Sequence, residues 1–284
     1  MRDLKTGLKA VIGAVGRFPG VRNVVQHPSV RKRLVKLPGS EYLYVGMFRT
    51  HPFDRAYGTN TGGVELPTDF AVNDFVRSNA SAYLGSQPNV IRLALGYLPP
   101  VDNCTFLDLG CGKGRPLFVA TEFPFRSIIG VELSTHLAEI ARRNAAIIAG
   151  RHPQRTPVKI VQADASTFAL PPGNLVIFLY HPFGYDVMAK VVASLEQALL
   201  ADDRSIYVVY YNPVAGRCFD ESASFRRRFG GMLAYAPEEK GYGLDLTEDP
   251  VVIWQGGGSA PSPTLSTNIK IVITPSGMGV ELVK

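Results

Sequence analysis

The chain has 284 residues, of which 46% are hydrophobic, 19% charged and 10% aromatic. These fractions are typical of a folded protein and exclude a disordered or collagen-like chain. A chain of this length buries roughly three quarters of its extended surface, so its core needs no disulfide or metal. The three cysteines show no CxxC spacing. We therefore expect no disulfide framework, no metal site and a reducing, cytoplasmic location.

The net charge of +6 is concentrated near the N-terminus. Residues 1–40 contain nine Lys and Arg residues and one acid, which gives +8, so the other 244 residues carry −2. The body is therefore close to neutral, and only the N-terminal arm has the charge expected of a segment that binds polyanions.

Apolar residues recur at helical spacing in this arm, with Lys5 and Lys9 on the opposite face. They are Leu4, Leu8, Val11, Ile12 and Val15. The pattern predicts an amphipathic helix that either docks on the body or binds anionic lipid or an acidic partner. No stretch of the chain reaches the ~18 apolar residues of a membrane span, and no clear signal-peptide cleavage site follows the arm helix.

From residue 104 onward, short apolar runs alternate with helical patterns, which predicts an α/β fold with a doubly wound, mostly parallel seven-stranded sheet. Parallel strands are expected at 105–109, 127–132, 158–162, 175–180 and 205–211. Two further strands at 232–236 and 251–254 would form a terminal antiparallel hairpin. Helices are expected near 114–123, 135–149 and 185–201.

Residues 215–229 are predicted to form one more helix, which ends before Gly230-Gly231. Arg226 to Arg228 would then form its solvated last turn, where cations offset the helix dipole. A nucleic-acid contact is the alternative for these arginines.

Four regions follow from these patterns. They are a basic helical arm (1–52), a lid with pre-sheet helices (53–103), the ligand-binding α/β domain (104–255), and a flexible linker with a C-terminal hairpin (256–284). Within the second region, the turn-rich segment 53–63 is interpreted as a lid over the site or as a plain connecting loop.

The most informative segment is TFLDLGCGKGR at residues 105–115, a strand that runs through a glycine-rich turn into a helix. The glycines allow close backbone approach, and the helix N-terminal N–H groups point into the crevice. The spacing is GxGxG and not the GxGxxG of dinucleotide-binding proteins. Asp108 precedes the turn, and a carboxylate there repels phosphate but suits a cationic ligand.

Two further acids follow the next two strands. Glu132 ends the second strand, where its carboxylate can accept both hydrogen bonds of a ribose diol. Asp164 ends the third strand, where it can meet an adenine amino group while the Ala165 N–H meets a ring nitrogen. All three acids lie at the carboxyl ends of consecutive strands, where open α/β sheets bind their ligands.

Across residues 83–254, these features resemble the class I S-adenosylmethionine-dependent methyltransferases. In that family the DxGxGxG turn holds the methionine part of the cofactor, and the acids after strands two and three hold ribose and adenine. The resemblance therefore implies S-adenosyl-L-methionine as cofactor. Its implied contacts are Asp108, Gly110, Cys111, Gly112, Gly114, Glu132, Asp164 and Ala165. Cys111 is expected to pack within the turn and not to act as a nucleophile.

The fourth strand ends in Tyr180-His181-Pro182-Phe183, where amino-methylating members carry an Asn- or Asp-Pro-Pro-aromatic motif. This segment resembles the Asn-containing aromatic loop of the disruptor-of-telomeric-silencing type of histone-lysine methyltransferase. The resemblance places Tyr180, His181 and Phe183 on the acceptor side. His181 stands where the amide would be, and it is either a general base or a positioning hydrogen-bond donor.

Those lysine methyltransferases also keep a Tyr-x-x-Thr loop that closes over the cofactor. Tyr83 and Ser86 lie at the matching place, 25 and 22 residues before Asp108. The resemblance therefore implies that both residues contact the cofactor.

The sequence thus predicts a methyltransferase that uses S-adenosylmethionine. The favoured acceptor is a nitrogen of a protein lysine. The alternatives are a small-molecule O- or N-methyltransferase with His181 as general base, and a non-catalytic S-adenosylmethionine-binding protein.

Overall fold

The computed structural model describes residues 50–65, 83–242 and 246–258, together with the backbone of 269–274 and 277–282. The amphipathic helix expected at residues 4–15 lies outside these ranges, as do residues 66–82 and most of the linker. Within the described ranges, none of the helices combines the length and apolar character needed to cross a membrane.

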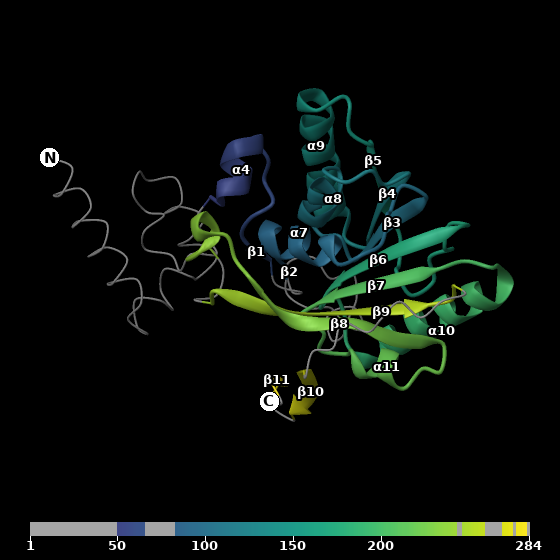
Figure 1. The fold of residues 1–284 in the computed structure, drawn as a ribbon. Helices are drawn as coiled ribbons and strands as arrows, with labels where there is room; N and C mark the ends of the chain where they lie inside the picture. Colours follow the sequence, from purple (N-terminus) through teal and green to yellow (C-terminus); the bar gives the residue numbers. More distant parts are fainter. Residues whose placement is uncertain (1–49, 66–82, 243–245, 259–268, 275–276, 283–284) are drawn as a thin grey trace, which may run out of the picture.

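A seven-stranded sheet forms the centre of the molecule, in the order β5-β4-β3-β6-β7-β9-β8 (Figure 1). Its strands are β3 (Cys104–Leu109), β4 (Ser127–Glu132), β5 (Val158–Gln162), β6 (Asn174–Tyr180), β7 (Ile206–Tyr211), β8 (Phe225–Ala234) and β9 (Glu248–Gly256). The first five strands of that order pair in parallel, and β9 runs antiparallel to both β7 and β8. The predicted doubly wound, mostly parallel sheet is therefore confirmed.

Helices cover both faces of the sheet (Figure 1). The described helices are α4 (Pro52–Tyr57), α7 (Pro88–Gly96), α8 (Arg115–Ala120), α9 (Thr135–Arg151), α10 (Tyr185–Ala201), α11 (Arg217–Asp220) and the 3-10 turn η3 (Pro237–Glu239). Of these, α4 packs on α9. Two antiparallel pairs lie outside the sheet: β1 (Val64–Glu65) with β2 (Tyr83–Leu84), and β10 (Ile269–Thr274) with β11 (Gly277–Leu282).

Alternation along the buried strands divides the core into two layers. Phe106 and Phe178 belong to the layer that packs against α7, α8 and the end of α9. Leu107 and Ile177 belong to the layer that packs against α10 and α11. Because successive side chains of a strand point to opposite faces, the near-continuous apolar runs of β3 and β6 supply both layers at once.

The chain order reverses between β3 and β6. From β3 the chain moves outward through β4 to β5, and it then returns to place β6 on the other side of β3. The connections on the two sides of this point diverge, which opens a crevice at the carboxyl ends of the strands.

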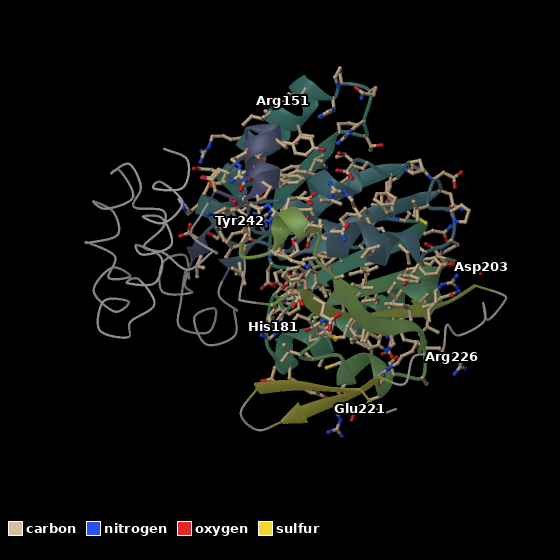
Figure 2. All side chains as sticks on the ribbon, turned by 60° about the vertical axis from the view of Figure 1, so that its left-hand side comes forward. Arg151, His181, Asp203, Glu221, Arg226 and Tyr242 are labelled. Carbon is tan, nitrogen blue, oxygen red and sulfur yellow. The ribbon has the colours of Figure 1, made fainter. Side chains whose placement is uncertain are left out.

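The helix predicted for residues 215–229 is wrong. Only Arg217–Asp220 is helical, and Phe225–Ala234 forms the edge strand β8. Phe225 and Phe229 are buried, while Arg226 is exposed and projects outward in Figure 2. A long antiparallel pairing with β9 outweighs local helix propensity here, and the exposed charge of Arg226 on this edge strand disfavours further pairing.

Arg115, the first residue of α8, joins the segment before the sheet to the glycine-rich turn. Its guanidinium is buried and donates to the Thr61 hydroxyl at 2.8 Å, the Thr61 carbonyl at 3.0 Å and the Ser86 carbonyl at 2.8 Å. The carboxylate of Asp54, from α4, lies 3.6 Å away. Gly85 permits this approach, because a Cβ there would lie 2.7 Å from the guanidinium.

We expect Arg115→Met to lower the free energy of unfolding by about 3 kcal/mol, because removing one partner leaves a buried carboxylate and buried carbonyls without their cation. Urea denaturation measures the loss. Arg217→Met is the matched control, because Arg217 pairs with Glu221 at the surface and its loss should leave the stability nearly unchanged. Equal effects of the two substitutions would contradict a stabilising role for the buried brace.

Candidate active site

A cavity of about 250 Å³ opens at the carboxyl ends of the parallel strands, on both sides of the point where the chain order reverses. In Figure 2, His181, after β6, lies on the opposite side of the molecule from Asp203, before β7. The cavity brings together all the site residues predicted from the sequence except Gly114, which caps α8 and packs against Phe118.

The glycine-rich turn after β3 forms the floor of the cavity. Gly112 has φ of 53°, and a Cβ at this position would lie 2.3 Å from the Tyr83 ring. Gly110 has φ of 87°, and its Cβ would lie 2.6 Å from Pro182. The glycines are therefore required both by the left-handed backbone and by two side chains that close on the turn.

Glu132 holds this turn against the end of β4. Its carboxylate accepts from the Gly112 N–H and from the Ser134 N–H, both at 2.8 Å. Burial raises its pKa, and the backbone hydrogen bonds oppose this shift. Because a carboxylate offers about four acceptor positions, Glu132 can still accept from a ligand.

The carboxylate of Asp108, in the neighbouring strand β3, is not held by comparable hydrogen bonds. Its side chain is 2% exposed, and its Oδ2 has no hydrogen-bond partner among the described residues. Burial, and then the nearby charge of Glu132, hold the pKa of Asp108 well above its ordinary value. A buried carboxylate without a partner costs free energy, so the cavity favours a ligand that brings a cation or hydrogen-bond donor to this atom.

Buried polar atoms without a partner gather at this cavity. In the part of the chain that the structure describes there are five such side-chain atoms, and three of them belong to cavity residues: Ser86 Oγ, Asp108 Oδ2 and His181 Nδ1. Buried polar groups are nearly always paired in folded proteins, so this concentration marks a place that a polar ligand completes.

The third acid, Asp164, lies on the rim of the cavity and is exposed. Its Oδ1 accepts from the Ser166 N–H at 2.8 Å and from the Ser166 hydroxyl at 2.7 Å. This turn after β5 presents Asp164 and Ala165 side by side to the cavity.

The opposite wall is the loop after β6. The Tyr180 ring packs on the Tyr211 ring with centroids 4.3 Å apart, and Tyr211 and Tyr235 both donate to the buried carboxylate of Asp249. Tyr211 is fixed by this hydrogen bond and therefore holds Tyr180 in place. Neither Tyr211 nor Tyr235 lines the cavity.

His181 follows with φ of 43°, in the left-handed region. Burial lowers its pKa, so its imidazole is neutral at neutral pH. Phe183 is buried beside it and also lines the cavity.

Cys111 packs as expected. Its side chain is buried against Gly130, and burial raises the pKa of its thiol well above the ordinary value. A thiol with a raised pKa is a poor nucleophile at neutral pH.

None of residues 53–63 lines the cavity. This segment contacts the site indirectly: the Thr61 carbonyl accepts from Tyr83 and Arg115, and the Asn60 backbone bonds to Asn144 of α9. The segment is therefore a brace behind the cavity wall in this structure.

Arg115 and Asn212 are polar cavity residues that sequence reasoning did not single out. The dipeptide Asn212-Pro213 directly after β7 was an available signal, because it ends a buried strand at the same edge of the sheet. No sequence signal pointed to Arg115, because its partners Asp54 and Thr61 lie more than 50 residues earlier in the chain. Among the described residues, no three His, Cys, Asp or Glu side chains are placed to hold a metal ion.

Comparison with known families gives one match: residues 107–200 fit the family described as "Methyltransferase domain". The matched range runs from β3 to the end of α10 and includes the glycine-rich turn and all three strand-end acids. A search of curated proteins finds no match.

Several solved structures are similar to this chain. A SAM-dependent methyltransferase from Leishmania major is 19% identical with a TM-score of 0.44, over 59% of this chain and 70% of the other. A precorrin-6y C5,15-methyltransferase from Geobacter metallireducens is 18% identical with a TM-score of 0.42, over 60% and 87% of the two chains. A 23S rRNA methyltransferase is 15% identical with a TM-score of 0.42, over 62% and 70%.

We expect Asp108→Asn to raise the stability of the ligand-free protein by about 1–3 kcal/mol at pH 8, because a neutral amide is cheaper to bury than a carboxylate. The raised pKa means that the folded state holds its proton to higher pH than the unfolded state does. Stability from this group is therefore lost as pH rises, and the gain in the variant should shrink toward pH 4.

Thermal unfolding at pH 4 and pH 8 measures this difference. Asp102→Asn is the control, because Asp102 is exposed at the other end of β3 and should change nothing. A variant less stable than the parent at pH 8 would show that the Asp108 carboxylate is already paired in the free protein.

Proposed function

We propose, from the premise that this chain carries a class I S-adenosylmethionine-dependent methyltransferase domain, that it transfers the methyl group of S-adenosylmethionine to a nitrogen of a protein lysine. One observation supports this proposal above the others. Three strand-end acids, the glycine-rich turn and an aromatic loop converge on a single cavity, and an unpartnered buried carboxylate oxygen there belongs to the acid that precedes the turn.

The residues of the cavity fit this cofactor. S-adenosylmethionine carries positive charge at its sulfonium and its ammonium group, and the cavity floor holds two buried carboxylates whose pKa values are both raised. A phosphate-bearing cofactor fits less well, because Asp108 and Glu132 would repel it.

Each residue has a stated part in the proposal. The Asp108 carboxylate and the glycine-rich turn hold the methionine portion, and the free acceptor positions of Glu132 hold the ribose diol. Asp164 meets the adenine amino group, while the N–H of Ala165 meets a ring nitrogen. Tyr83 and Ser86 close this side of the cavity, since Tyr83 packs on Gly112 and the Ser86 hydroxyl is buried without a partner.

Bound S-adenosylmethionine supplies an electrophilic methyl group on a positively charged sulfur. The chain supplies alignment and exclusion of water, because Tyr180 and Phe183 wall the acceptor side with aromatic faces. That methyl group would be supplied to the lone pair of the acceptor nitrogen, and the cofactor would be left as a neutral thioether. The acceptor releases one proton, which His181 or solvent takes up.

A second candidate is a small-molecule O- or N-methyltransferase in which His181 is the general base. One observation favours it: His181 Nδ1 is buried without a partner in the cavity wall, and the lowered pKa keeps the ring neutral. A neutral imidazole at the acceptor position can remove a proton from a hydroxyl.

Calorimetry with S-adenosylhomocysteine tests cofactor binding. We expect the parent protein to bind and Asp108→Asn to weaken binding by about tenfold or more, which is the loss of one charge-assisted hydrogen bond. Asp102→Asn should bind as the parent does. If the parent gives no heat with this ligand or with S-adenosylmethionine, the proposed function is wrong.

A methyl-labelling assay with fractionated lysate separates the acceptor classes. For a lysine acceptor, label enters protein, and His181→Asn keeps activity to within about tenfold because an amide can position the nitrogen. If His181 is the base, His181→Asn should lower the methyl-transfer rate by about 10²-fold or more. The fall of the rate below pH 6.5 in the parent protein should then be absent from the variant. Binding without label in any fraction would indicate a non-catalytic protein.

A further inference from the structure

Within the described residues, two that are not glycine have a positive φ: His181 at 43° and Asn212 at 55°. Both line the cavity. They follow directly on Tyr180 and Tyr211, which are register partners in the parallel pair of β6 and β7. Left-handed backbone at a residue with a side chain costs free energy, and it concentrates at functional sites.

Asn212 is the more unusual of the two, because Pro213 follows it. A residue before proline is driven toward extended backbone, so a left-handed conformation there must be held by its surroundings. The Asn212 N–H donates to the Pro250 carbonyl at 2.8 Å, and its own carbonyl accepts from the Val214 N–H at 2.8 Å. The antiparallel strand β9 thus fixes this turn.

These hydrogen bonds use only the backbone of Asn212. None of the side-chain hydrogen bonds among the described residues involves the Asn212 carboxamide, and Asn212 lines the cavity. A structural asparagine of a turn normally bonds to its own turn through the side chain, so this free carboxamide is unexplained by the fold. On the neighbouring strand, His181 presents a second unpartnered polar group, its buried Nδ1.

We propose that Asn212 is an acceptor-positioning residue, whose carboxamide oxygen and the unpartnered Nδ1 of His181 accept hydrogen bonds from the N–H groups of a nitrogen acceptor. The loop after β6 has a histidine in place of an amide, and the structure places an amide at the end of the next strand instead. Adjacent parallel strands lie about 4.8 Å apart, so side chains at their ends can form hydrogen bonds with the same ligand nitrogen.

This inference rests on the proposed function and narrows it. Two hydrogen-bond acceptors at one place select an acceptor that carries two N–H hydrogens, such as a primary amine, over a hydroxyl or a tertiary amine. The lone pair of that nitrogen then stays free for the methyl group.

Sinefungin is a suitable probe, because it carries an amine-bearing carbon where the cofactor carries its methyl sulfonium. S-adenosylhomocysteine lacks any group there. The ratio of the two affinities, measured by calorimetry, therefore reports on hydrogen-bond acceptors at the position of the transferred methyl and needs no known substrate.

We expect Asn212→Gly to weaken sinefungin binding about tenfold and to leave S-adenosylhomocysteine binding within twofold. Glycine adopts the positive φ without strain, so the variant removes the carboxamide and keeps the turn. Asn212→Asp, which also tolerates this backbone and keeps an acceptor oxygen, should retain sinefungin binding. Asn103→Gly is the control, because Asn103 is exposed before β3 and should change neither affinity.

Equal weakening of both ligands in Asn212→Gly would assign Asn212 a purely structural role and overturn the inference. An unchanged sinefungin affinity would overturn it as well, while the proposed function would stand, since both ligands still bind. If the parent protein binds neither ligand, the proposed function and this inference fail together.

Discussion

The buried guanidinium of Arg115 is the contact on which the ligand site depends. It stands at the first position of α8, where the helix dipole disfavours a cation, and it is held there by Asp54 and by carbonyls of Thr61 and Ser86. These partners come from two separate segments before the sheet. Arg115 therefore joins the glycine-rich turn to the segments that cover it. Because Arg115 fixes Thr61, the Thr61 carbonyl can hold the Tyr83 hydroxyl while the Tyr83 ring packs on Gly112.

The buried acids of the cavity lower the stability of the folded protein. Asp108 and Glu132 are both buried, which raises the pKa of each, and the nearby charge of Glu132 raises that of Asp108 further. Two backbone N–H groups donate to the Glu132 carboxylate and offset part of the cost of its burial, whereas Asp108 has no such donors. Such an unbalanced pair persists where a cationic ligand offsets it, as expected for a site that binds a sulfonium compound. The neutral ring of His181 on the opposite wall adds no charge that would oppose that ligand.

Much of the sheet could be predicted from the sequence, because its central strands are buried on both faces and show as short apolar runs. The limits of β4 and β5 agree with the prediction to the residue. The segment Phe225–Ala234 could not be predicted, since its helical appearance is local and its pairing with β9 involves residues up to 31 positions away. Its two phenylalanines, three arginines and two glycines also lack the continuous apolar run that marks the central strands.

The sequence by itself determined which groups meet at the cavity: the three strand-end acids and the glycine-rich turn are placed by strand periodicity, and they meet because parallel strands end at one edge. Only the tertiary structure decided what surrounds them. Arg115 finds Asp54 and Thr61 across more than 50 residues, and Asn212 reaches the cavity because β9 holds its backbone in a conformation that the following proline disfavours. Periodicity reports which face a residue occupies, whereas partners from distant segments and strained backbone angles depend on packing of the whole chain.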